Sequence, residues 1–549
     1  MALVAVALDV AIVALVCLVL WVGASGGGTF EIAGARVTAR DTGNPLLFIT
    51  IAGVARYALR RSVPFLGIRS LTLRDIDLRA REVCQSIEHR LALTSGRTGS
   101  RLVLALVVTA VAIKAAFAWH DPGFYSGDDV EVQEMSLKAL LGTDWTVWDL
   151  RNATFPLGVV YPAQRLATAI GISGIPALVF AGRLVVAILS SIGIWIVWRA
   201  GRMMWTDAPG FALAAAFLLW TGSLHMAFGS SELPRPVSTL FVLGGFLALQ
   251  SPGRGAALVS GVLLGVAACF RFSEIVFLVP AAAQLLLAGR FGSAAVLGAS
   301  ALTAAALVLG LTDRWYWGTP FHSVWAAVDF TLVKRLSSRG YESPLWYVLQ
   351  CPRWISPVLL VAAALAFVRR RTAEGFWIWV PLLLLSCFPH KEARYALPIV
   401  PFVCLAAVRG LRDACEMSAQ RRWLAPAMIA GLGIGCAYDV SHWRLPRTNG
   451  DVRLAARMAE AMPSGVPVAI EQAWRMGGRL YFASSAVTDL DPPRLGDAEY
   501  LWAHVPPAAW VAIDGRGRSA RTVEEQLTSR GYVLAMNSGD SFYRVWAPR

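Results

Sequence analysis

The chain has 549 residues, of which 56% are hydrophobic and 16% are charged, and its formal net charge is +14. A soluble protein carries about 25% charged residues, so this composition excludes an ordinary soluble globular protein. The positive charge does not indicate a nucleic-acid partner. Arginine supplies all but four of the 50 basic residues and lies mostly in short loops beside apolar runs, which is typical of the cytoplasmic loops of membrane proteins.

Apolar runs of membrane-spanning length recur along the chain. They lie near residues 2–22, 44–58, 101–119, 174–198, 209–228, 234–250, 255–270, 274–289, 292–312, 354–368, 375–389, 395–411 and 424–441. A helix spans a bilayer with about 17–25 apolar residues, and its backbone finds no other hydrogen-bond partner in lipid. The pattern predicts a polytopic α-helical membrane protein with about thirteen transmembrane helices. The first run lacks a basic n-region and a clear cleavage site, so we interpret it as a retained helix; the short second run is alternatively interfacial.

The placement of arginine predicts the orientation. Segment 59–101 is rich in arginine and belongs in the cytoplasm under the positive-inside rule. The same alternation then places Arg199, Arg202, Arg254, Arg290, Arg369–Arg371 and Arg421–Arg422 inside as well. Four segments fall on the extracytoplasmic side: 120–165, 313–353, the turn around His390 and the region 442–549. We therefore expect a multi-pass protein of the cell's inner (plasma) membrane.

The region 442–549 differs from the rest in composition. Its patterns predict helices at 451–462 and 523–529, with strands at 466–470, 480–483, 510–513, 532–535 and 541–546. This predicts a small extracytoplasmic α/β domain that recognises an acceptor or covers the site. The chain then divides into N-terminal membrane helices with a basic cytoplasmic segment (1–100), a membrane catalytic domain (101–441) and this C-terminal domain (442–549).

The first external loop holds four carboxylates within seven residues, namely Asp128, Asp129, Glu131 and Glu134. If 128–141 is helical, then Asp129, Gln133 and Ser136 share one face, and Asp128 stands at the helix start, where a carboxylate caps free N–H groups. These aspartates are then either simple helix caps or a general base that takes the proton of an attacking hydroxyl.

The turn between the runs 375–389 and 395–411 packs four ionisable side chains against the membrane: His390, Lys391, Glu392 and Arg394. External turns are usually poor in basic residues, and ionisable groups near a bilayer are candidates for function. The three cations could bind a lipid phosphate and stabilise a leaving group, while Glu392 orients its neighbours. An interfacial charge cluster is the alternative.

Two further arginines lie near the external ends of apolar runs. Arg183 and Arg271 each either bind an anion or form an intramembrane ion pair. The large external loop 313–353 is rich in aromatic residues, which form either an interfacial belt or a surface that stacks on a sugar or a polyprenyl chain.

The turn residues suggest a family. The stretch His390–Tyr395, followed by Leu397, Pro398 and Pro401, resembles the His-Lys-Glu-x-Arg-Phe signature of the GPI-anchor and N-glycan mannosyltransferases that use dolichyl-phosphate mannose, the glycosyltransferase family 22 type. Tyr395 replaces the usual Phe. The first external loop is similar to the family's acidic loop through Asp128-Asp129, Gln133, Trp148-Asp149 and Arg151. The second is similar through Asp313, Tyr316, Gly318, Tyr341, Pro344 and Tyr347. The resemblance spans roughly residues 101–412.

This resemblance implies a GT-C fold and an inverting transfer of a hexose, in the family mannose, from a polyprenyl-phosphate sugar to an acceptor hydroxyl. Asp128 or Asp129 is then the base. The donor phosphate is bound by His390, Lys391 and Arg394, with Arg271 or Arg183. The supporting residues are Glu131, Gln133, Trp148, Asp149, Arg151, Glu392, Asp313, Tyr316 and Tyr341.

The chain also departs from the family. The usual acidic pair is Asp-Glu followed by aromatic residues, whereas here Val130 follows Asp128-Asp129, and the spacing from Trp148 to Arg151 is shorter. The composition suggests a bacterial relative, so the carrier is expected to be polyprenyl phosphate. The eight cysteines form no CxxC pair or Cys/His cluster, so no metal site is expected. The only co-substrate expected is the lipid-linked donor. The rival interpretations are a transporter or flippase for lipid-linked glycans, which would hold its charges near mid-membrane, and a non-catalytic assembly component.

Overall fold

The computed structural model describes residues 97–549, except for 144, 146, 148–150, 335–341, 371, 389, 417–423 and 483–484, together with short pieces before residue 97. Those pieces include the antiparallel strands β1 (Gly28–Ile32) and β2 (Ala35–Ala39). The basic segment as far as residue 96 and much of the first two predicted runs lie outside the described residues, and so do Trp148, Asp149 and Tyr341.

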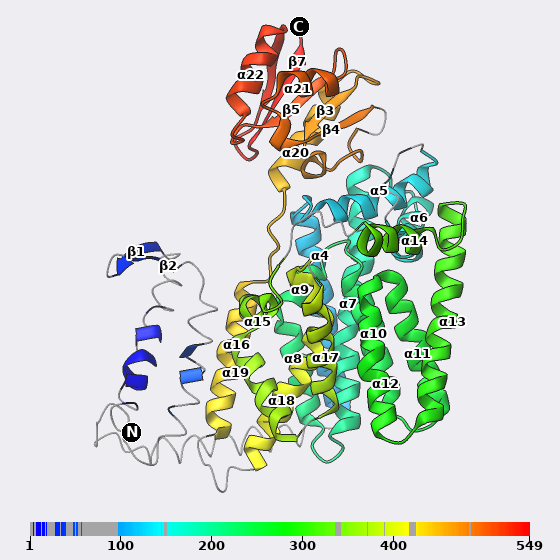
Figure 1. Ribbon diagram of the computed structural model, residues 1–549, viewed down its shortest axis with the longest axis vertical. Helices are drawn as coiled ribbons and strands as arrows, with labels where there is room; N and C mark the ends of the chain where they lie inside the picture. Colours follow the sequence, from blue (N-terminus) through cyan, green and yellow to red (C-terminus); the bar gives the residue numbers. More distant parts are fainter. Residues whose placement is uncertain are drawn as a thin grey trace.

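A bundle of apolar helices forms the body of the molecule (Figure 1). Four helical stretches are long and apolar enough to cross a membrane: Thr98–His120 in α4 (Arg97–His120), Ile175–Met204 (α7), Phe291–Tyr316 (α13), and Ala393–Ala414, which joins η6 (Ala393–Ile399) to α18 (Val400–Glu416). The shorter apolar helices are α8 (Gly210–Thr221), α10 (Arg235–Leu249), α11 (Arg254–Phe270), η3 with α12 (Phe272–Leu287), α16 (Pro357–Arg370), α17 (Ala373–Cys387) and α19 (Leu424–Ser441).

Each predicted run from 101–119 to 424–441 therefore coincides with a helix or a helix pair. The expected count of thirteen transmembrane helices is not established by these elements, because only four of the described stretches meet the length and hydropathy that crossing requires. Close backbone approach explains how such short helices pack. A Cβ added to Gly261 or Gly265 of α11 would collide with the backbone of α13 at Leu297 or Ala301. Small residues of this kind let apolar helices associate without a hydrophobic driving force.

Shorter helices gather at one end of the bundle (Figure 1). They are α5 (Gly127–Leu141), η2 (Pro156–Val160), α6 (Tyr161–Ala169), α9 (Ser223–Phe228), α14 (His322–Val328), η4 (Asp329–Val333), α15 (Trp346–Gln350) and η5 (Cys351–Arg353). The predicted helix 128–141 is α5. Asp128 and Asp129 lie in its first turn, where carboxylates interact favourably with the helix dipole.

The C-terminal region contains a five-stranded sheet, which lies beyond the end of the bundle that carries α5 (Figure 1). Its strands run in the order β4 (Val487–Leu490), β3 (Val468–Glu471), β5 (Trp510–Asp514), β7 (Tyr543–Pro548), β6 (Tyr532–Asn537). β3 is parallel to β4 and to β5, whereas β7 is antiparallel to β5 and to β6. The helices are α20 (Asn449–Ala461), η7 (Ala473–Met476), η8 (Pro492–Arg494), α21 (Ala498–His504) and α22 (Ala520–Ser529).

The strand expected at 480–483 is wrong. Gly477 and Gly478 adopt positive φ and turn the chain instead, and Leu480 is buried in a cluster with Phe124 and Val130 of the membrane part. The apolar character of this stretch therefore reflects a contact with α5 rather than a place in the sheet, and the strand follows later, at Val487–Leu490.

Hydrogen bonds join the C-terminal region to the first external loop. The Arg479 N–H donates to Oε1 of Glu134 at 2.7 Å. The Gly123 N–H donates to Oδ1 of Asn449 at 2.8 Å, and the Thr448 N–H donates to the carbonyl of Phe124 at 3.1 Å. The C-terminal region is thus in contact with both the start and the middle of the loop that carries the aspartates.

The Gly123 contact predicts a stability change. A Cβ at this position would collide with the backbone of Thr448 and Asn449, so Gly123→Ala is expected to destabilise the protein by about 1–3 kcal/mol. Thermal unfolding followed by tryptophan fluorescence measures this. Gly255→Ala is the control, because a Cβ there meets nothing within 4 Å. Equal unfolding temperatures for the two variants would show that the contact does not form.

The Glu134 contact predicts a pH dependence. Burial raises the pKa of Glu134 from 4.5 to about 7, so attachment of the C-terminal region favours the protonated carboxyl. The attachment is therefore strongest below about pH 4.5 and weakens as the pH rises through 7. Hydrogen exchange of the peptide that contains Arg479, after division by the base-catalysed intrinsic exchange rate, should show less protection at pH 8 than at pH 6. Glu134→Gln keeps the acceptor but cannot ionise, so this difference should disappear; a difference that persists contradicts the assignment.

Candidate functional site

Asp128 is held between two arginines that lie far from it in the sequence. One carboxylate oxygen lies 2.6 Å from Nη2 of Arg394, and the other lies 2.8 Å from Nη2 of Arg151. Arg394 is in the first turn of η6, and Arg151 follows α5 in the same external loop. The first external loop (residues 120–165, the acidic loop) and the turn His390–Arg394 (the cationic turn) are therefore joined by a direct ion pair.

Side chains within the cationic turn interact with one another. Glu392 is ion-paired with Arg394, and its other oxygen lies 3.2 Å from Nε2 of His390. Lys391 is 5% exposed, and its ammonium donates to the main-chain carbonyls of Glu342 and Phe388. Arg394 thus contacts Asp128, His390 is 30% exposed and contacts Glu392, and Lys391 connects the turn to the loop before α15.

Tyr395 lies between two more arginines. The guanidinium carbon of Arg235 is 3.6 Å from the centre of the Tyr395 ring, and that of Arg271 is 5.8 Å away. Arg235 is also 3.8 Å from Oε1 of Glu274 and donates to Ser273 at 2.9 Å. Sequence reasoning missed Arg235, although its position in the first turn of an apolar helix, where the dipole disfavours a cation, was an available signal.

Arg271 differs from its neighbours in lacking an acidic partner. Among the described residues it forms no ion pair with a carboxylate, and its one side-chain hydrogen bond is to the Tyr395 hydroxyl at 3.5 Å. Asp128 is ion-paired with both Arg151 and Arg394, while Glu274 is ion-paired with Arg235. Arg271 therefore carries a positive charge that no carboxylate neutralises by direct contact, beside the Asp128 pair.

The two aspartates of the acidic pair have different environments. Burial raises the pKa of Asp128, but attraction to Arg394, Arg151 and Arg271 outweighs it and holds the pKa well below its usual range. Asp129 is 1% exposed and accepts hydrogen bonds from the Tyr125 N–H at 3.1 Å and the Ser126 hydroxyl at 3.0 Å. Burial and the nearby charge of Glu232 raise its pKa to about 7. Asp128 thus faces the arginines, whereas Asp129 braces the start of α5.

Arg183 does not join this cluster. It forms a buried ion pair with Glu232 at 2.8 Å and donates to the carbonyls of Asp121 at 2.9 Å and Gly123 at 2.8 Å. Its guanidinium therefore fastens the start of the external loop to α7. The sequence offered anion binding or an intramembrane ion pair for this residue, and the geometry is that of the ion pair. Its partner Glu232 was missed because nothing in its local sequence distinguishes it.

The other supporting residues have structural partners. Gln133 donates to the carbonyl of Val179 at 3.3 Å and accepts from Gln164 at 2.7 Å, while Ser136 donates to the same Gln164. The predicted shared face of Asp129, Gln133 and Ser136 is buried. Glu131 is ion-paired with Arg151 and so supports the Asp128 pair from the same helix.

Of the residues predicted from the second external loop, Tyr347 reaches the cationic turn, where its hydroxyl donates to the Glu392 carbonyl at 3.5 Å, whereas Asp313 and Tyr316 have partners near the end of α13. Asp313 is buried at the end of α13, where it accepts hydrogen bonds from the N–H of Ser323 at 2.9 Å and its hydroxyl at 2.7 Å. The Tyr316 ring packs edge-on against Trp317 at 4.9 Å. Both residues therefore shape the loop between α13 and α14.

Comparisons with known proteins indicate a family and a fold. The model of the Alg9-like mannosyltransferase family matches residues 131–451. No curated protein sequence matches the chain. Among solved structures, ArnT from Cupriavidus metallidurans bound to undecaprenyl phosphate is similar with a TM-score of 0.55 and 14% identity, over 82% of this chain and 98% of that chain.

The Archaeoglobus fulgidus oligosaccharyltransferase, solved in complex with Zn and sulfate, is similar with a TM-score of 0.52 and 12% identity, over 80% of this chain and 72% of that chain. Both are GT-C glycosyltransferases, so the helical bundle with a small C-terminal sheet is a GT-C-like fold. The family match covers more than half of the chain, including α5 from Glu131, Arg271 and the whole cationic turn. The chain belongs to the Alg9-like mannosyltransferase family.

Proposed function

We propose that the protein transfers a hexose from a polyprenyl-phosphate sugar to an acceptor hydroxyl, with inversion at the anomeric carbon. The family match favours mannose as the hexose. The observation that carries this proposal is the arrangement of Asp128 against Arg394 with Arg271 beside it. A carboxylate next to cations is what an attack by a hydroxyl on a sugar phosphate requires, because one group must take a proton while others stabilise a departing phosphate.

In this mechanism the acceptor oxygen bonds to the anomeric carbon as the bond from that carbon to the phosphate oxygen breaks. The hydroxyl proton passes to Asp128, and the electron pair leaves with the lipid phosphate. Arg394 and Arg271 stabilise the added negative charge, since guanidinium groups match phosphate oxygens in geometry and charge. His390, which reaches Glu392 at 3.2 Å, is a further donor to that phosphate.

The choice of Asp128 over Asp129 follows from accessibility. The side chain of Asp128 is 17% exposed, whereas Asp129 is buried with its oxygens engaged by Tyr125 and Ser126. Attraction to the arginines keeps Asp128 ionised at neutral pH, at some cost in basicity. A bound donor phosphate competes for the same arginines and so returns basicity to Asp128.

Several observations support the carrier and the side of the membrane. ArnT, which has the same fold, was solved with undecaprenyl phosphate, and the arginine-rich loops favour a cytoplasmic side opposite α5. We place the reaction on the extracytoplasmic face of the inner membrane. Residues 101–441 form the catalytic part, residues 1–100 precede it, and residues 442–549 stand outside with the acceptor.

Asp128→Asn tests the base. The amide cannot take a proton, so turnover should fall by about 10²–10⁴-fold, measured with labelled polyprenyl-phosphate mannose and membranes that supply the acceptor. Asp329→Asn is the matched control, because Asp329 is another carboxylate of the external loops and is ion-paired with an exposed Lys334. Full turnover by both Asp128→Asn and Asp129→Asn would disprove general-base catalysis by this pair.

Arg271→Ala tests the phosphate site. Hydrogen bonds between charged groups contribute about 1.5–3 kcal/mol, so the Kd for undecaprenyl phosphate should rise roughly 10–100-fold. Binding is measured by titration in detergent. Arg314→Ala serves as the comparison, because that arginine donates to the carbonyl of Gly318 in an exposed turn. Equal affinities of the two variants for undecaprenyl phosphate would show that Arg271 does not bind the phosphate.

A further inference from the structure

A cavity lies at one edge of the C-terminal sheet, where all three parallel strands end. Its volume is about 440 Å³. Glu471 is the last residue of β3, Ile513 is near the end of β5, and Pro492 and Pro493 follow β4. The remaining wall is the start of α22. We call this the switch-point cavity.

The strand order explains why a cavity forms here. The chain leaves β3 to reach β4 on one side and then crosses to β5 on the other side of β3. The connections therefore diverge above β3 and leave a crevice at its carboxyl end. In open α/β sheets this crevice is where ligands bind, whatever their chemistry.

One wall of the cavity presents a buried carboxylate with an unused oxygen. Glu471 is 7% exposed, and its Oε2 accepts from the Asp514 N–H at 2.8 Å. Among the described residues Oε1 accepts no hydrogen bond. It lies on the side of Gly517, which also lines the cavity, since a Cβ added there would stand 3.7 Å from Oε1. This oxygen borders the cavity and can accept hydrogen bonds from a ligand's hydroxyl groups.

Other walls present donors and an apolar surface. Arg518 lines the cavity, and its guanidinium forms no ion pair or hydrogen bond among the described residues. Ser519 begins α22 and does not cap it with its side chain, so N–H groups of the first turn remain available. Pro492, Pro493 and Leu495 supply the apolar wall.

The balance of charge indicates the class of ligand. An anion would meet Glu471 and a cation would meet Arg518, whereas a neutral ring with several hydroxyl groups satisfies both and rests its C–H face on the prolines. The volume of about 440 Å³ is within the range for small-ligand sites.

A contact of Trp474 links the cavity to the neighbourhood of Asp128. Trp474, three residues after Glu471, packs on Gly127, since a Cβ there would lie 3.6 Å from its indole. Gly127 precedes Asp128 in α5. Three residues of chain and this contact place Glu471 within roughly 25 Å of Asp128, a span that an oligosaccharide of a few residues covers.

We propose that the switch-point cavity binds a neutral sugar residue of the acceptor glycan, a few residues away from the hydroxyl that reacts at Asp128. The acceptor is accordingly an oligosaccharide or a glycolipid with several sugars. This proposal rests on the proposed glycosyltransferase function.

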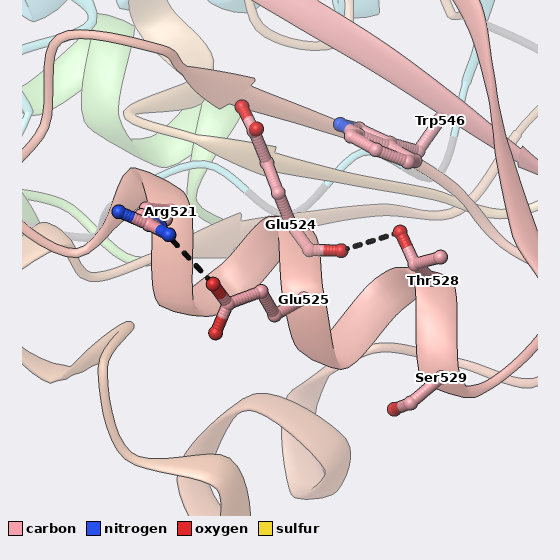
Figure 2. A pocket seen from close by; sticks show the side chains of 6 residues that line it. All are labelled: Arg521, Glu524, Glu525, Thr528, Ser529 and Trp546. Atoms are coloured by element: carbon pink, nitrogen blue, oxygen red, sulfur yellow. Dashed lines mark hydrogen bonds and ion pairs between the residues drawn. The ribbon is translucent and has the colours of Figure 1, made fainter.

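A second hollow on α22 provides the contrast (Figure 2). It is lined by Arg521, Glu524, Glu525, Thr528, Ser529 and Trp546 and has a volume of about 550 Å³. Its polar groups bind one another: Arg521 pairs with Glu525 at 3.1 Å, and the Thr528 hydroxyl donates to the Glu524 carbonyl at 2.8 Å. The side chain of Arg521 is 92% exposed. Among the described residues the indole Nε1 of Trp546 lacks a hydrogen-bond partner here, but the exposed Arg521 is already paired, so it supplies a control position.

The test is binding of neutral linear trisaccharides of mannose, glucose and galactose to the full-length protein, measured by saturation-transfer NMR. Wild type should bind at least one of them. Arg518→Ala, which removes a donor, and Ala520→Trp, which fills the cavity, should each weaken binding roughly tenfold or more. Arg521→Ala should bind as wild type does.

The outcomes separate the two proposals. No binding by wild type, equal binding by wild type and both cavity variants, or binding of inorganic phosphate alone overturns the cavity. Sugar transfer by wild type together with unchanged binding by the variants means that only the cavity proposal fails. Trisaccharide binding that depends on Arg518, in a protein that transfers no sugar, means that only the proposed function fails.

Discussion

The pairing of Asp128 with Arg394 is the interaction on which the site depends. The two residues are 266 positions apart in the chain, they lie 2.6 Å apart, and Arg394 is only 5% exposed. Each residue also has a second partner, since Arg394 pairs with Glu392 and Asp128 pairs with Arg151. The pair therefore holds the external loop against the cationic turn and brings together the groups that we propose to react. The buried pair of Arg183 and Glu232 fastens the other end of the same loop.

Much of this arrangement is accessible from sequence because it rests on local patterns. Apolar runs predict helices at nearly the observed positions, and the contact of Asp128 with Arg394 is consistent with the predicted common side of the membrane. The sequence does not show which charged side chains form ion pairs or hydrogen bonds with each other. Lys391 looks like a phosphate ligand but donates to two main-chain carbonyls, and Arg183 looks similar but is engaged by Glu232. Arg235 and Arg271 differ only in whether an acid lies opposite, a property of three-dimensional packing.

The C-terminal region shows a different limit. The apolar pattern around Leu480 predicts a strand, yet Leu480 packs with Phe124 and with Val130 of α5. A local pattern identifies burial but not the surface that provides it. This contact attaches the C-terminal region to the membrane part. The region also bonds to the loop at Gly123 and Glu134, so its position and that of the first turn of α5 are mechanically linked.

Tyr395, where relatives carry Phe, has a consequence for the resting enzyme. A Phe ring would still lie beneath Arg235, but only a phenol offers Arg271 an oxygen, here at 3.5 Å. A neutral acceptor restrains a guanidinium without cancelling its charge, as a carboxylate would. In the proposed reaction the charge of Arg271 is thus retained for a carrier phosphate, and the guanidinium is already oriented before that phosphate binds, so less conformational freedom is lost on binding.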